Sequence, residues 1–104
     1  MALSDVAVLR KAASYMKAHG HAKGFLERDG KVCLAGAINK VLTGDACNWP
    51  ARTNKLIRRV ATYLCRQKRL PTGSISAISW NNEAGRKGDE VIAALRGTAK
   101  SIAR

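Results

Sequence analysis

Apolar residues recur every three or four positions in four separate stretches of this chain, and this helical spacing is the strongest constraint on its fold. Ser4 is suited to cap the first helix and Gly20 to end it, while Thr53 or Asn54 is suited to cap the third. Short connections between four main helices predict an all-α fold, a compact bundle forming one domain over residues 1–104. The four stretches cover residues 4–19, about 33–43, 53–69 and 89–102.

The segment between the first two helices has a different pattern. Asp29-Gly30 stands between "FLER" and "KVCL", and this dipeptide is favoured at the tip of a two-residue hairpin. We therefore predict a short β-hairpin between helices 1 and 2. Residues 75–82, "ISAISWNN", are predicted to form one or two helical turns before the last helix.

Aromatic residues make up only 5% of the chain, so the core must consist mainly of Ala, Val, Leu and Ile. Such a core suits close-packed helices better than a β-sandwich. Apolar faces this rich in Ala could also support a dimer, and the sequence leaves the oligomeric state open.

The formal net charge is +12, from 19 basic and 7 acidic residues. This imbalance raises the affinity for phosphate polymers and acidic partners. A soluble protein with a generally basic composition is the alternative interpretation of the same numbers.

Much of the positive charge falls on one side of the third predicted helix. At 100° per residue, six basic side chains fall within about 120°, opposite an apolar sector. No acid occurs between Asp45 and Glu83, so nothing within the segment neutralises this face. Because arginine suits forked contacts with phosphate, the face is a candidate binding surface. Its residues are Arg52, Lys55, Arg58, Arg59, Arg66 and Arg69.

Three hypotheses for this face stay open. The first is a nucleic-acid partner bound with little sequence preference, because the chain has no zinc-finger spacing and no aromatic run for stacking bases. The second is an acidic protein, for example a host protein captured by an interaction module. The third is a merely solvated helix face.

A second candidate site is the segment "SWNNEAGRKG". It is a recognition loop if Arg86 and Lys87 lie beside an exposed aromatic edge of Trp80, with Asn81 and Asn82 next to it. The alternative is structural: Trp80 anchors the segment and the asparagine side chains cap a helix end.

No sequence motif indicates catalysis or a cofactor. There is no P-loop, GxSxG or HExxH, and the pair His19 and His21, with Cys33 nearby in sequence, lacks a fourth metal ligand. Cys33 is expected to be a small buried residue, with a thiol-dependent activity as the weaker alternative. No apolar run approaches the roughly 18 residues of a membrane span, and no signal peptide is recognised. We expect a cytoplasmic, non-enzymatic protein without metal or cofactor.

Five short motifs are found along the chain: Arg28-Asp29-Gly30, Cys33, Gly36-Ala37, Trp80-Asn81 and Glu90-Val91. They resemble motifs of a family of small uncharacterised proteins from actinobacteria and their phages. The resemblance implies such an origin, including the cytoplasm of an infected host, but no activity. Residues 45–70 match poorly, so the basic segment is expected to be particular to this chain.

Overall fold

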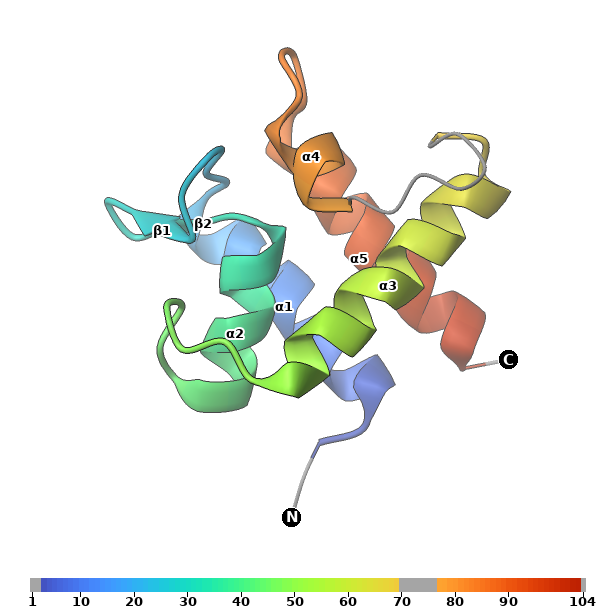
Figure 1. Cartoon of the computed structure of the whole chain (residues 1–104), viewed down its shortest axis with the longest axis horizontal. Helices are drawn as coiled ribbons and strands as arrows, with labels where there is room; N and C mark the ends of the chain where they lie inside the picture. Colours follow the sequence, from blue (N-terminus) through green and yellow to red (C-terminus); the bar gives the residue numbers. More distant parts are fainter. Residues whose placement is uncertain (1–2, 70–76, 104) are drawn as a thin grey trace.

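The structure is a computed structural model that describes residues 3–69 and 77–103. The predicted all-α class, with four long helices and a hairpin between the first two, is confirmed. Residues 75 and 76 of the expected short helix lie outside the described residues. In the described part the elements are α1 (Asp5–His19), β1 (Glu27–Arg28), β2 (Lys31–Val32), α2 (Leu34–Thr43), α3 (Ala51–Arg66), α4 (Ala77–Asn82) and α5 (Gly88–Ile102) (Figure 1).

Local capping explains the bounds of α1, as the sequence predicted. The Oγ of Ser4 accepts a hydrogen bond from the backbone N–H of Ala7 at 3.1 Å. At the other end Gly20 adopts a φ of 105° and its N–H donates to the carbonyl of Met16 at 2.7 Å. Glycine suits this position because a positive φ costs it little.

The predicted ends of α3 are wrong at both sides. Pro50, not Thr53 or Asn54, precedes the first helical residue, and Thr53 is buried within the helix. At the C-terminal end Lys68 has a φ of 57°, and the N–H of Arg69 donates to the carbonyl of Leu64 at 2.9 Å. This pattern is a Schellman motif, which ends the helix at Arg66 and turns Arg69 away from it.

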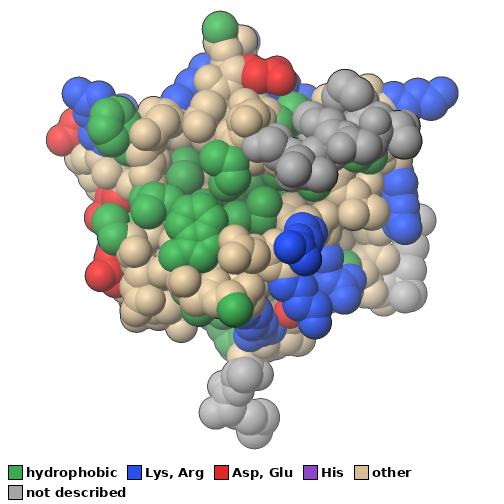
Figure 2. All heavy atoms as spheres, in the orientation of Figure 1, with side chains coloured by type: hydrophobic (Ala, Val, Ile, Leu, Met, Phe, Trp, Pro, Cys, Tyr) green, Lys and Arg blue, Asp and Glu red, His purple; other side chains and the backbone are tan. Residues whose placement is uncertain are grey.

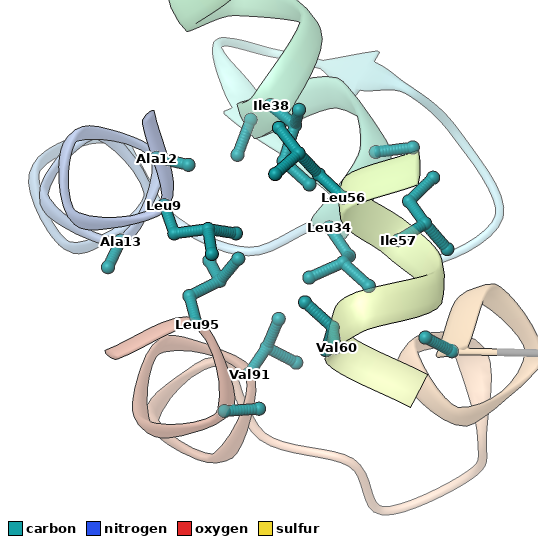
Figure 3. Packing of buried hydrophobic residues seen from close by; sticks show 14 of the residues in the cluster. Leu9, Ala12, Ala13, Leu34, Ile38, Leu56, Ile57, Val60, Val91 and Leu95 are labelled. Atoms are coloured by element: carbon teal, nitrogen blue, oxygen red, sulfur yellow. The ribbon is translucent and has the colours of Figure 1, made fainter. Parts of the chain in front are cut away.

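The core lies where the four long helices meet. α1 packs mainly against α5 and next against α2, and α3 lies across α2 and α5. Figure 3 shows side chains from all four helices meeting in this interior, among them Leu9, Leu34, Leu56 and Leu95, which are fully buried. The core therefore consists of the aliphatic residues that the composition indicated, with Trp80 as a large aromatic addition. None of the described helices combines the length and apolarity that would let it cross a membrane.

Two buried polar side chains fix the start of α3 against α2. Thr53 Oγ1 donates to Asn39 Oδ1 at 2.6 Å, and Asn39 Nδ2 donates to the carbonyl of Ala46 at 2.8 Å. Both side chains are 0% exposed. Because an unpaired buried polar group is costly, these bonds define how the two helices meet.

A close backbone contact holds the hairpin against α2. The carbonyl of Leu26, just before β1, approaches Gly36 so closely that a Cβ there would lie 1.9 Å from its oxygen. The same carbonyl accepts a hydrogen bond from the N–H of Cys33 at 3.3 Å. Glycine at this position is therefore required by space rather than by backbone conformation.

We predict that Gly36→Ala lowers the free energy of unfolding by about 1–3 kcal/mol, because the added methyl group must displace the backbone of the hairpin. This cost opposes the better helix propensity of alanine. Chemical denaturation followed by circular dichroism measures it. Ser14→Ala, at an exposed position of α1, is the control and should change stability by no more than about 0.5 kcal/mol. A Gly36→Ala variant as stable as the parent would contradict the contact.

Candidate nucleic-acid interface

Helix α3 presents an apolar face to the core and a basic face to solvent. Leu56, Val60 and Leu64 are 0% exposed, as expected for the core side. Lys55, Arg58, Arg59 and Arg66 are exposed, whereas Arg52 is half-buried. The amphipathic pattern predicted for this segment is therefore present, apart from Arg69, which follows the end of the helix.

Asp5 at the start of α1 neutralises part of the basic face. Its Oδ1 lies 2.8 Å from Arg52 Nη2, and its Oδ2 lies 3.6 Å from Arg59 Nε. Arg52 also donates to the carbonyl of Leu3 at 2.5 Å. Arg52 therefore ties α3 to the beginning of α1, and we assign it a structural role.

Arg69 lies in a different cluster from the other basic residues. Its Nη2 is 2.7 Å from Glu90 Oε2 on α5, and its guanidinium lies 5.1 Å from the centre of the Trp80 ring. The Schellman turn after α3 directs the side chain to this place. The prediction that six basic residues share one face is therefore wrong in one respect: Arg69 does not lie on that face.

Three basic side chains of α3 keep an uncompensated charge. Among residues 3–69 and 77–103, no acid forms an ion pair with Lys55, Arg58 or Arg66. Together with Arg59 they line a groove of about 350 Å³ between α3 and α5, and no acid contributes to its lining. Figure 2 shows basic side chains gathered over α3. The groove is therefore strongly cationic.

Hydroxyl groups and one aliphatic residue complete the groove. Thr62 and Tyr63 of α3 face Thr98, Ser101 and Ile102 of α5 across it. Tyr63 packs so closely on α5 that a Cβ at Gly97 would lie 2.2 Å from its hydroxyl oxygen. The sequence projection missed these residues. Thr62 falls at about the middle of the basic sector and could have been found, whereas Ser101 joins the site only through helix packing.

Trp80 of the candidate recognition loop is part of the interior. It is 1% exposed, so the exposed aromatic edge that a recognition loop requires is not there, and the structural alternative of an anchoring Trp80 agrees with the structure. The Arg86 guanidinium lies 4.2 Å from the Trp80 ring centre, and its Nε donates to the Trp80 carbonyl at 2.9 Å. Arg86 also pairs with Glu83 and Glu90. Asn82, residues 83–85 and Lys87, which immediately precedes α5, are exposed.

Asn81 and Asn82 attach α4 to the segment around the hairpin. Asn81 Oδ1 accepts from the N–H of Leu34 at 3.2 Å and lies 2.8 Å from His21 Nε2. Asn82 Oδ1 accepts from the N–H of Gly24 at 2.9 Å. The bond to Leu34 caps the first turn of α2, which agrees with the structural alternative considered for these asparagines.

Cys33 is buried at the start of α2, where the sequence placed it. Burial raises the pKa of its thiol, although the backbone N–H of Gly36 donates to the sulfur at 3.3 Å and acts in the opposite direction. A raised pKa disfavours the thiolate, which is the nucleophilic form. Within the described part of the chain, no group of three or more His, Cys, Asp or Glu residues is arranged to hold a metal ion.

The Glu90 carboxylate joins several parts of the Trp80 cluster. The backbone N–H of Lys87 and the Arg86 guanidinium donate to it, and these bonds hold the pKa of Glu90 below its ordinary value. The ionised Glu90 carboxylate therefore stabilises the folded state at neutral pH. This stabilisation is lost as the pH falls below the range in which free glutamate titrates, because the carboxylate becomes protonated.

We predict that the melting temperature of Glu90→Gln lies below that of the parent at pH 7 and that the difference shrinks as the pH approaches 3. Calorimetry between pH 3 and 7 provides the measurement. A difference that stays constant over this range would show that the charge of Glu90 makes no contribution.

Comparison with known proteins identifies a family to which the chain is related, but it gives no activity for the chain. No curated protein and no solved structure shows significant similarity to the chain. A family described as a family of unknown function, DUF6197, matches residues 1–101, including the basic segment that the short motifs left aside. The chain therefore belongs to this family of unknown function, DUF6197.

Proposed function

We propose that this protein is a non-enzymatic binding protein that holds nucleic acid through its phosphates, with little preference for sequence. The observation that carries the proposal is the cationic groove between α3 and α5. Its binding residues would be Lys55, Arg58, Arg59 and Arg66. Arg52 and Arg69 were also predicted to bind, but they are not among the proposed binding residues because they pair with Asp5 and Glu90.

The chemistry of the groove suits phosphate. Arginine offers several N–H donors in a planar fork, and lysine adds a compact charge. The hydroxyls of Tyr63 and Ser101, which have no hydrogen-bond partner among the described residues, add neutral donors. A binding surface made of these groups contacts the backbone of a nucleic acid and does not read base edges, so it discriminates weakly between sequences.

We predict that Arg58→Glu reduces the affinity for a fluorescent duplex of random sequence by at least tenfold, because a repulsive charge replaces a phosphate contact. Arg96→Glu, an equal change of charge at an exposed position of α5 outside the groove, is the matched control and should bind nearly as the parent does. Fluorescence anisotropy measures both. Equal losses in the two variants would mean that only the overall charge matters.

The salt dependence of the affinity of the parent protein for nucleic acid tests how many phosphates it contacts. Four phosphate contacts should weaken binding roughly a hundredfold between about 50 and 200 mM salt, because each contact releases counterions. No binding of either the duplex or a single strand at the lower salt concentration would overturn the proposed function.

An acidic protein is the second candidate partner, and the groove gives it one specific support. Ile102 and the ring of Tyr63 line the groove beside the basic side chains, and they would accept an apolar side chain next to a carboxylate. Trp80 and Arg86 of the candidate recognition loop are engaged with each other within the fold. A partner captured from a nuclease-treated lysate by the parent but not by Arg58→Glu would favour this candidate.

We also propose a cytoplasmic location in an actinobacterium or in a phage-infected host cell. The support for this origin is the resemblance of the short motifs around the hairpin and Trp80.

A further inference from the structure

Two exposed aromatic side chains, Phe25 and Trp49, line the same small cavity outside the α3–α5 groove. Phe25 is 51% exposed and Trp49 is 41% exposed. Both line a small cavity of about 130 Å³, together with Ile78 and Asn82. Figure 2 shows hydrophobic side chains grouped on this face of the molecule, next to the basic side chains over α3. Neither aromatic residue is part of the α3–α5 groove.

Trp49 is held in place on the first turn of α3. Its indole Nε1 donates to Asn54 Oδ1 at 2.8 Å, which fixes the ring edge against the helix. Arg58 follows Asn54 by four residues, so the two side chains are neighbours about one helical turn apart. The residue that holds the indole is therefore about one helical turn from Arg58, which has no ion-pair partner among the described residues.

Asn82 provides a hydrogen-bond donor at the same cavity. Its Oδ1 accepts from the N–H of Gly24 at 2.9 Å and from Asn81 Nδ2 at 2.8 Å, and these two bonds fix which end of the amide is the oxygen. The remaining Nδ2 has no partner in the part of the chain that the structure describes. A donor beside aromatic rings suits a planar group that carries acceptor atoms on its edge, as nucleobases do.

From this arrangement we infer that the ligand is single-stranded nucleic acid, with one unpaired base packed against Trp49 and its phosphates on Arg58 and Lys55. The inference rests on the proposed function and names its substrate class. In a duplex the bases are already stacked and paired, so they are not free to cover an aromatic side chain. Single strands combine exposed base faces with backbone charge, which aromatic side chains beside a basic groove can bind together.

Size and charge argue against other occupants of this cavity. About 130 Å³ is well below the roughly 300–1,000 Å³ of pockets that hold drug-sized molecules, so one planar group rather than a whole metabolite fits. The Arg28 guanidinium lies 4.8 Å from the Phe25 ring centre, which adds a further positive charge at the rim. An anionic ligand with planar apolar groups complements both features.

The test compares a twelve-nucleotide oligothymidine with a duplex of equal length for three proteins: the parent, Trp49→Leu and Trp49→Phe. Trp49→Leu keeps an apolar side chain but removes the aromatic face, and it should weaken binding of the single strand about tenfold while leaving the duplex within about twofold. Trp49→Phe keeps an aromatic face and should retain most of the affinity. Circular dichroism confirms that each variant is folded.

Tryptophan fluorescence of the parent gives a measurement that needs no substitution. Trp49 is accessible and Trp80 is 1% exposed, so quenching by oligothymidine would report base contact at Trp49. If Arg58→Glu weakens binding of both nucleic acids but Trp49→Leu weakens neither and no quenching occurs, the proposed function stands and this inference is wrong. If the parent binds neither nucleic acid, both are overturned, and binding of an acidic peptide instead would assign the surface to a protein.

Discussion

The arrangement of the hairpin, α2 and α4 depends on one buried amide, that of Asn81. The side chain is 0% exposed, and both ends are bonded: Oδ1 to the N–H of Leu34 and to His21 Nε2, and Nδ2 to the carbonyl of Ala22 and to Asn82 Oδ1. Three of these partners lie 47 to 60 residues away in the sequence. Leaving any of them unpaired in the interior would be costly, so these bonds favour one packing of α4 over its alternatives. That packing in turn brings Asn82 and Ile78 to the cavity beside Trp49 and Phe25.

The charges of α3 are divided between structure and surface. Asp5 and Glu90 come from the first turns of α1 and α5, where the helix dipole also favours an acid. Each carboxylate lies close to a basic residue in or just after α3, and thereby joins helices that are distant in sequence. Lys55, Arg58 and Arg66 have no such partner in the described part of the chain, and the uncompensated charge gathers along the groove with α5. The repulsion between the positive charges of α3 is thus reduced, because tertiary contacts with acids of other helices neutralise part of them.

Local features of the fold were predictable, and features that depend on burial were not. The four long helices follow from apolar periodicity, and Ser4, Gly20 and the Asp29-Gly30 turn act within a few residues of themselves. Thr53 failed as a predicted cap because its hydroxyl bonds to Asn39, a partner on another helix. Whether Trp80 lies at the surface or in the interior could not be decided from the sequence, because sequence spacing does not show which side of a six-residue helix the other elements cover.

For the candidate site, the helical segments, the amphipathic face of α3 and the excess of positive charge could be predicted, because they depend on residue type and on the local geometry of a helix. Tertiary contacts, in contrast, set which of those charges are neutralised. They also bring hydroxyls of α5 opposite these charges across a groove and place Trp49 and Phe25 at the same cavity. The physical reason is that ion pairs and grooves form between elements distant in sequence, and their positions are set by how the apolar faces and buried amides pack.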